Sequence, residues 1–186
     1  MKYCFGVDIG GTTVKMGLFE ESGTIIDKWE ISTDTSEEGK AILPNIAVSI
    51  EKKIEEHKLD KNDIAGIGAG VPAPVTAEGV VNGSANLGWT YKEVKKEFEE
   101  LTGLTSYIAN DANVAALGEM WKGGGEGEKN MIMVTLGTGV GGGIIIDGKM
   151  LVGANGAGGE IGHLCVYDET DQCACANRGC LEQYAS

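Results

Sequence analysis

The chain has 186 residues, of which 42% are hydrophobic, and its formal net charge is −13. This length suits one domain or one and a half. So acidic a composition argues against a nucleic-acid-binding surface, which needs clustered Lys and Arg to replace counterions. The first ten residues, MKYCFGVDIG, form neither a signal peptide nor a membrane span. We therefore expect a cytoplasmic protein with no nucleic-acid and no membrane partner.

The first two thirds of the chain give strand signals followed by alternating helix and strand signals. Residues 3–8, 13–19 and 24–31 are β-rich runs separated by glycine turns, and they predict an antiparallel three-stranded meander. Helices are predicted after Pro44, around residues 94–101, and from Asp111 to about residue 122. Strands are predicted over residues 63–70 and 106–109. The pattern predicts an α/β lobe over residues 1–122.

The passage after the glycine-rich linker repeats the opening of the chain. Aligning VDIGGTTVKMGLFEESG with VTLGTGVGGGIIIDGKM pairs Gly10 with Gly137, and it pairs a strand over residues 14–19 with one over residues 141–146. A single repeat at such long spacing is typical of a duplicated domain rather than a solenoid. Residues 123–186 are therefore predicted to begin a second α/β lobe, with too little chain here for a full copy.

The two glycine turns are candidates for phosphate binding. Glycines let backbone amides approach a phosphate closely, and Asp8 is placed to hold a hydrated Mg²⁺. An ordinary Gly-Gly hairpin is the alternative for the first turn. The second copy favours nucleotide binding, because two facing turns supply many donors for a triphosphate. We assign the following residues to ATP and its Mg²⁺: Asp8, Gly10, Gly11, Thr12, Thr13, Lys15, Gly137, Thr138 and Gly139.

An acidic residue marks the end of the predicted strand over residues 106–109. The segment Asn110-Asp111-Ala112-Asn113 lies where a strand should end and a helix begin, the edge at which α/β proteins place ligands. Asp111 is the candidate general base. Asn and Asp also cap helices routinely. Asn110 can supply that cap while Asp111 acts as the base.

A cluster of four soft or borderline ligands follows the second turn, at the spacing His-x9-Cys-x-Cys-x4-Cys. Its members are His163, Cys173, Cys175 and Cys180. The alternative is three free cysteines and a core histidine, but Asn177 and Arg178 make the segment too polar for a core. We predict a closed, structural Zn²⁺ site, since thiolate clusters in cytosolic proteins are chiefly metal sites. Cys4 and Cys165 lie in apolar, strand-like surroundings and are predicted to be small core residues.

Two glutamates, Glu160 and Glu182, bracket the metal-binding segment. Carboxylates accept hydrogen bonds from the hydroxyls of a polyol substrate. Solvent-exposed glutamates without a ligand remain the alternative for both.

These motifs together resemble the ROK family of repressors and sugar kinases, and within it the bacterial glucokinase-like members. The most specific match runs from His163 through Val166 and the three clustered cysteines to Ser186, and DIGGT, NDAN and LGTGVGGG fit as well. The resemblance implies duplicated ribonuclease-H-like lobes of the actin and hexokinase type. It also implies that the second lobe is incomplete here and continues beyond Ser186.

The resemblance implies ATP-dependent phosphorylation of the 6-hydroxyl of an aldohexose, with glucose as the expected substrate and Asp111 as the base. It implies that His163 gives one ring nitrogen to zinc and the other to a sugar hydroxyl, in a homodimer or homotetramer. A sugar-responsive transcription regulator and a non-catalytic sugar-binding fragment are the alternatives. The implied sugar contacts are Asn86, Asn110, Asp111, Glu160, His163 and Glu182.

Two positions depart from the family pattern, which usually has glycine where this chain has Ala73 and Ala176. Alanine fits such a position when its φ angle is negative. We therefore interpret both departures as adjusting the loops rather than abolishing the sites, which requires a negative φ at both residues.

Overall fold

The computed structural model describes residues 2–167 and 172–186, and the chain divides into two compact units, residues 1–111 and 112–186. The division falls after Asp111, the first residue of the helix over residues 111–122, whereas the predicted lobe boundary falls after the end of that helix. The helix belongs with the second unit because it packs against a glycine-rich strand of that unit.

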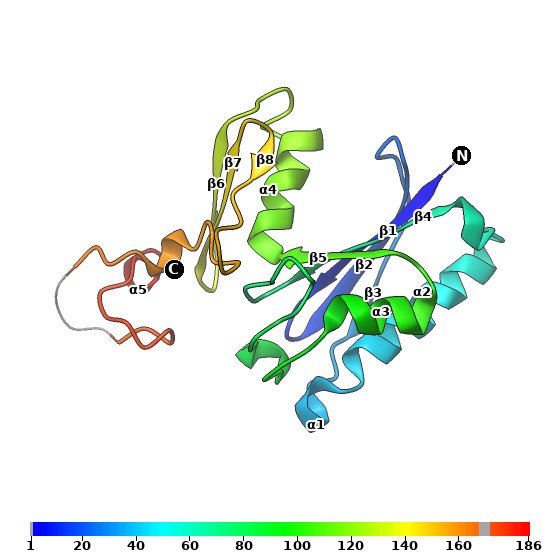
Figure 1. Cartoon of the computed structure of the whole chain (residues 1–186), viewed down its shortest axis with the longest axis horizontal. Helices are drawn as coiled ribbons and strands as arrows, with labels where there is room; N and C mark the ends of the chain where they lie inside the picture. Colours follow the sequence, from blue (N-terminus) through cyan, green and yellow to red (C-terminus); the bar gives the residue numbers. More distant parts are fainter. Residues whose placement is uncertain (1, 168–171) are drawn as a thin grey trace. The chain divides into compact units, whose positions relative to one another are not determined.

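The first unit is built on a five-stranded sheet in the order β3-β2-β1-β4-β5 (Figure 1). Its strands are β1 (Tyr3–Ile9), β2 (Thr13–Glu20), β3 (Ile25–Ser32), β4 (Ile64–Val71) and β5 (Ser106–Asn110). β1, β2 and β3 pair antiparallel, which confirms the predicted meander, while β4 and β5 continue the sheet in parallel with β1. This mixed order is that of a ribonuclease-H-like lobe.

Two long helices contribute to the core of this unit and lie on the same side of its sheet (Figure 1). They are α2 (Ile42–Glu56) and α3 (Val94–Thr102), and the short elements are α1 (Ser36–Gly39), η1 (Lys61–Asp63) and η2 (Ala85–Leu87). Ile46, Ile50 and Ile54 recur at four-residue spacing in α2 and are buried. They join one cluster with alternate residues of β1, including Phe5 and Val7.

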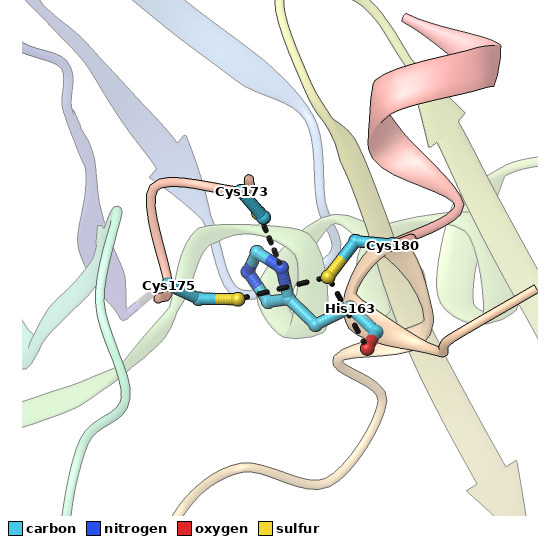
Figure 2. Close-up of side chains that lie close together, drawn as sticks. All are labelled: His163, Cys173, Cys175 and Cys180. Atoms are coloured by element: carbon cyan, nitrogen blue, oxygen red, sulfur yellow. Dashed lines mark hydrogen bonds between the residues drawn. The ribbon is translucent and has the colours of Figure 1, made fainter. Parts of the chain in front are cut away.

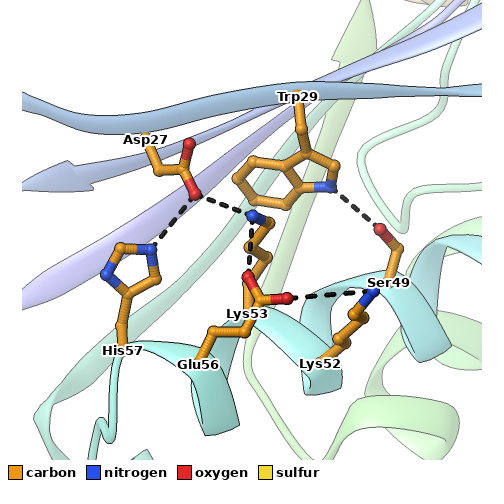
Figure 3. Close-up of polar contacts among 7 residues, drawn as sticks. All are labelled: Asp27, Trp29, Ser49, Lys52, Lys53, Glu56 and His57. Carbon is orange, nitrogen blue, oxygen red and sulfur yellow. Dashed lines mark hydrogen bonds and ion pairs between the residues drawn. The ribbon is translucent and has the colours of Figure 1, made fainter.

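A polar clamp joins α2 to β3 (Figure 3). Lys53 Nζ donates to Asp27 Oδ2 at 2.9 Å, and His57 Nε2 lies 3.1 Å from the same oxygen. The Trp29 indole donates to Ser49 Oγ at 2.8 Å, and the Lys53 ammonium lies 5.2 Å from the centre of the Trp29 ring. These contacts fix the register of the helix on an otherwise half-exposed strand.

The second unit repeats the start of the first. A three-stranded antiparallel sheet has the order β6-β7-β8, and its strands are β6 (Met131–Leu136), β7 (Val140–Ile146) and β8 (Lys149–Met150). The helical segments are α4 (Asp111–Lys122), η3 (Ile161–His163) and α5 (Glu182–Ala185). The β6-β7 hairpin corresponds to the β1-β2 hairpin, so the repeat in the sequence is a repeat in the fold.

Glycines in β7 allow other segments to approach both of its faces. A Cβ at Gly143 would lie 2.4 Å from Ala116 Cβ of α4, and one at Gly142 would lie 2.6 Å from the Gly159 carbonyl. Real Cβ atoms do not tolerate such distances, so any side chain there would force the helix or the loop away. Part of the glycine run is thus required for packing, independently of any ligand.

Among the described residues, no helix combines the length and apolar character that crossing a membrane requires.

Candidate functional site

The predicted ligand cluster is assembled in the second unit (Figure 2). One ligand atom from each of four residues lies within 4.8 Å of all the others: His163, Cys173, Cys175 and Cys180. Cys173 Sγ lies 3.6 Å from His163 Nδ1, and Cys175 Sγ lies 3.7 Å from Cys180 Sγ.

These two distances match the edges of a zinc tetrahedron. With Zn–S bonds of about 2.3 Å and Zn–N bonds of about 2.0 Å, tetrahedral ligands lie about 3.8 Å apart for two sulfurs and about 3.5 Å for sulfur and nitrogen. Three thiols and one imidazole are also the donor set that tetrahedral zinc prefers. The residues present therefore fit a closed zinc site.

Backbone hydrogen bonds bring the ligands together. The amide of Ala176 donates to the Cys173 carbonyl at 2.9 Å, which forms a tight turn around Cys175. The amide of Leu181 donates to the Leu164 carbonyl at 2.9 Å, which returns Cys180 to the side of His163. Local turns thus place ligands that are up to seventeen residues apart in the sequence.

The thiols of the cluster differ in acidity. A hydrogen bond from the backbone amide of Asn177, followed by one from Cys173, lowers the pKa of Cys175. Burial, followed by the contact with Cys175, raises the pKa of Cys180 to about 12. Only a thiolate ligates zinc, so metal binding at this cluster must displace the Cys180 proton.

The two ring nitrogens of His163 lie in different surroundings. Nδ1 faces Cys173 inside the cluster, while Nε2 lies 3.9 Å from Glu160 Oε2. Both side chains are about one third exposed, at 36% for His163 and 32% for Glu160. The Nε2 edge and the Glu160 carboxylate therefore form a polar, solvent-accessible pair next to the Cys/His cluster.

Glu182 joins the Cys/His cluster to the second glycine turn. Its Oε2 accepts a hydrogen bond from the Val140 amide at 3.0 Å, and its Oε1 lies 3.9 Å from Cys173 Sγ. A Cβ at Gly139 would lie 2.3 Å from Glu182 Oε2. The close carboxylate thus explains why residue 139 is glycine. The other two residues of the turn, Gly137 and Thr138, are exposed to solvent.

The first glycine turn is closed and supported from β3. The Gly10 amide donates to the Thr13 carbonyl at 3.1 Å, and the Thr33 hydroxyl donates to the Gly10 carbonyl at 2.6 Å. Gly11 and Thr12 are exposed at its tip. The sequence interpretation missed Thr33, because only the antiparallel pairing of β2 with β3 brings it to the turn.

Asp8 and Lys15 lie directly opposite each other on β1 and β2. Cross-strand partners share one face of a sheet, and both residues are exposed. The two residues assigned to the magnesium ion and the phosphates are therefore neighbours beside the first turn.

The carboxyl ends of β1, β4 and β5 meet at one edge of the first sheet. β5 ends at Asn110, which pairs with Val71 at the end of β4, and Asp8 near the end of β1 pairs with Gly70. Asn110 Nδ2 also donates to the Ala73 carbonyl at 3.4 Å. This parallel pairing puts Asp111, the next residue, at the same edge as the first glycine turn.

Asn86 comes to that edge from the loop after β4. A Cβ on Gly11 would lie 3.0 Å from the Asn86 carbonyl, so the glycine turn and this loop are in contact. The first unit thus gathers three of the implied sugar contacts, Asn86, Asn110 and Asp111, near the phosphate turn. The other three, Glu160, His163 and Glu182, lie in the second unit.

Two expectations about individual residues were wrong. Ala176 has a φ angle of +69°, so the alanine occupies a left-handed conformation that favours glycine, whereas Ala73 has no positive φ. Cys165 is exposed rather than part of the core, although its neighbours in the sequence are apolar. Both errors arise because turn geometry, not local composition, decides these environments.

Comparison with known proteins points to the same family from the sequence and from the structure. The ROK family model matches residues 4–186. The chain is 47% identical to a glucokinase of Halalkalibacterium halodurans, over 100% of this chain and 57% of the relative. A crystal structure of a ROK family glucokinase from Streptomyces griseus with glucose and AMPPNP has a TM-score of 0.84 and 36% identity, covering 99% of this chain and 57% of that one.

Regulators occur among the relatives as well. A ROK family transcriptional regulator, a homologue of the E. coli MLC protein, has a TM-score of 0.85 and 26% identity over 99% of this chain and 46% of its own. The chain thus spans roughly half of the length of these proteins. With the duplicated sheets and the Cys/His cluster in place, a family match that covers almost the entire chain shows that it belongs to the ROK family.

Proposed function

We propose that this chain is part of an ATP-dependent hexose kinase that phosphorylates the 6-hydroxyl of glucose. The observation that carries the proposal is the shared sheet edge, where the Gly10 turn, Asn86 and the Asn110-Asp111 pair come together. The 47% identity to a glucokinase and the likeness to a glucokinase crystallised with glucose and AMPPNP support it.

In the proposed reaction, Asp111 accepts the proton of the sugar 6-hydroxyl while that oxygen attacks the γ-phosphorus of ATP. The new O–P bond forms as the bond from the γ-phosphorus to the β,γ-bridging oxygen breaks, and ADP leaves. Asn86 and Asn110 would orient the sugar through hydroxyl contacts.

The two turns would hold the nucleotide. Backbone amides of Gly10, Gly11, Gly137 and Gly139 and the hydroxyls of three threonines can donate to phosphate oxygens, and Lys15 supplies a positive charge. Asp8 would hold Mg²⁺, which when bound neutralises charge on the phosphates. The three threonines are Thr12, Thr13 and Thr138.

We further propose that the Cys/His cluster binds one structural Zn²⁺. When bound, the metal supplies folding energy and fixes the imidazole of His163 through Nδ1. His163 Nε2 and Glu160 would then meet sugar hydroxyls, and Glu182 would assist from the glycine-turn side. The cluster distances support this assignment.

The regulator reading has weaker support. The regulator relative is 26% identical to this chain, against 36% for the glucokinase structure of similar TM-score. Asp111 would also have no proton to accept in a protein that only binds sugar. We place the enzyme in the cytoplasm, where ATP is available and thiols stay reduced, as a homodimer or homotetramer.

The test uses the full-length protein that contains this sequence, alongside the 186-residue chain, loaded with zinc. Each is incubated with Mg-ATP and a panel of hexoses and N-acetylhexosamines, and the products are identified by mass. Glucose 6-phosphate is the expected product, and Asp111→Asn should reduce kcat by roughly 10²–10⁴-fold while KM for glucose changes little.

The matched control is Asp63→Asn, at an exposed aspartate in η1. It should leave kcat unchanged. Undiminished turnover in Asp111→Asn would remove Asp111 from the base role. Glucose binding without any phosphorylated sugar from the full-length protein would favour the regulator or binding-fragment alternatives.

Metal analysis tests the zinc assignment separately. We expect one Zn²⁺ per chain in protein purified without chelator, and less than half of that in Cys173→Ser. Cys4→Ser is the control, since Cys4 lies in β1 of the other unit.

A further inference from the structure

A fifth cysteine, Cys165, lies directly beside the zinc-ligand cluster. Cys165 and Cys180 form an antiparallel bridge pair between two extended segments. Cys165 is exposed and its Sγ donates to the Tyr167 carbonyl at 3.3 Å, whereas Cys180 is buried. One partner thus faces solvent, and the other is a predicted metal ligand.

The hydrogen bonds around this pair define its type. The Val166 amide donates to the Gly179 carbonyl at 2.8 Å, and the Leu181 amide donates to the Leu164 carbonyl at 2.9 Å. Both bonds flank the pair, and Cys165 and Cys180 share none between themselves. They are therefore a non-hydrogen-bonded antiparallel pair, whose Cα atoms lie about 4.5 Å apart and whose side chains are close.

That spacing lies within the range of disulfides, whose Cα atoms are separated by about 4.4–6.8 Å. A Cβ built on Gly179 would lie 3.4 Å from Cys165 Sγ, so this sulfur already rests against the segment that carries Cys180. Bridging the pair requires rotation of side chains and no new approach of the backbone.

We propose that Cys165 is a redox modification site, which forms a disulfide with Cys180 in response to hydrogen peroxide and so releases the zinc. The inference rests on the proposed zinc site, and it adds a regulatory role that the kinase function does not require. Because four other side chains already complete the set of zinc ligands, Cys165 is not needed to hold the metal. Its sulfur can instead form a bond with one of these ligands, Cys180.

The chemistry balances in two steps. The exposed Cys165 thiol reacts with one peroxide to give a sulfenic acid and one water. The Cys180 thiolate then attacks the Cys165 sulfur, so that the S–S bond forms while the S–O bond of the sulfenic acid breaks and hydroxide leaves. Once oxidised, Cys180 would no longer be available as a zinc ligand. Only three protein ligands would then remain, which is too few to retain the zinc, and His163 would lose the fixed orientation of its imidazole.

The experiment treats the zinc-loaded protein with hydrogen peroxide, follows zinc release with a chromogenic chelator, and maps the disulfides by mass spectrometry. Cleavage after Glu160, Glu169 and Arg178 puts Cys165, the pair Cys173 and Cys175, and Cys180 on separate peptides. The peptides that become linked therefore identify the pairing directly, with no need for kinase activity.

We expect a Cys165–Cys180 linkage, release of about one zinc per chain, and recovery of the zinc site after reduction by dithiothreitol and addition of zinc. Cys165→Ser and Cys165→Ala should each bind zinc normally and release it roughly tenfold more slowly under peroxide, since the exposed first target is gone. Cys4→Ser should behave as the unmodified protein.

The proposal would be overturned if both Cys165 variants released zinc as fast as the unmodified protein, or if the main linkage formed among Cys173, Cys175 and Cys180. If the purified protein binds no zinc, the zinc assignment fails, and the same mapping on the metal-free protein still decides whether Cys165 and Cys180 pair. Kinase activity is measured in parallel and does not affect either readout.

Discussion

The Glu182 carboxylate accepts a hydrogen bond from the Val140 amide at 3.0 Å, and the same carboxylate approaches Cys173 of the Cys/His cluster. The second glycine turn and the cluster are therefore mechanically connected through one side chain. A substitution at the turn or at Glu182 should therefore change how much the other contributes to stability.

We predict that Glu182→Ala lowers the free energy of unfolding by about 1–3 kcal/mol, because the Val140 amide loses its acceptor. Glu182→Gln should lose less, since the amide oxygen can still accept. Denaturant titration of the zinc-loaded protein measures both changes, and equal losses in the two variants would argue against the hydrogen bond as the cause.

Gly139→Ala tests the same contact from the opposite side. The added Cβ would lie 2.3 Å from Glu182 Oε2, so the carboxylate must move and the variant should lose about 1–3 kcal/mol of unfolding free energy. In the Glu182→Ala background the added methyl meets no carboxylate and should cost much less. A double-mutant cycle measures this coupling, and strictly additive effects would contradict it.

Ala176→Gly should stabilise the protein, since φ is +69° at a position where a Cβ is disfavoured. The expected gain is about 1 kcal/mol, measured by denaturant titration of zinc-loaded protein. Ala73→Gly is the matched control and should destabilise, because Ala73 is buried with no positive φ. A loss of stability in Ala176→Gly would mean that the alanine methyl makes packing contacts that outweigh the strain.

Gly143→Ala should push α4 away from β7, because the new Cβ would lie 2.4 Å from Ala116 Cβ. Such overpacking typically costs about 1–3 kcal/mol, which thermal unfolding can measure. Gly118→Ala on the same helix is the control. It meets no atom within 4 Å and should stabilise by about 1 kcal/mol through helix propensity.

The clamp at Asp27 should give the stability a dependence on acidic pH. Hydrogen bonds from Lys53 and then from His57 lower the pKa of Asp27 below its ordinary value. A lowered pKa contributes stability that is present above the unfolded-state pKa of about 3.9 and is lost as the pH falls through the folded-state pKa. Asp27→Asn should therefore be less stable than the unmodified protein at pH 7.

The difference in stability between Asp27→Asn and the unmodified protein should shrink as the pH falls below about 4, as measured by urea titration at a series of pH values. Asp63→Asn, outside the clamp, serves as the control. A constant difference across this range would mean that the substitution acts through packing rather than through the charge of Asp27.

Much of the local structure followed from the sequence. The alternation around Phe5 and Val7, the four-residue spacing of Ile46, Ile50 and Ile54, and the glycine turns predicted the meander, the α2 helix and the two hairpins. These features depend on residues close together in the chain, so their periodicity is visible without a structure.

The gathering of the Cys/His cluster was also predictable, since it depends on residue type and spacing, while the binding of zinc there stays a prediction. Which nitrogen of His163 faces the sulfurs was not, because the ring orientation depends on the fold of the whole loop. The positive φ of Ala176 and the exposure of Cys165 were likewise decided by turn geometry.

By itself, the sequence determined the elements, the duplication and the donor atoms that this protein offers. Only the tertiary structure decided that the ends of β1, β4 and β5 meet at one edge, that Glu182 reaches Val140, and that Cys165 pairs with Cys180. The physical reason is that these contacts join distant parts of the chain, and hydrogen bonding and close packing select them only when the whole unit folds.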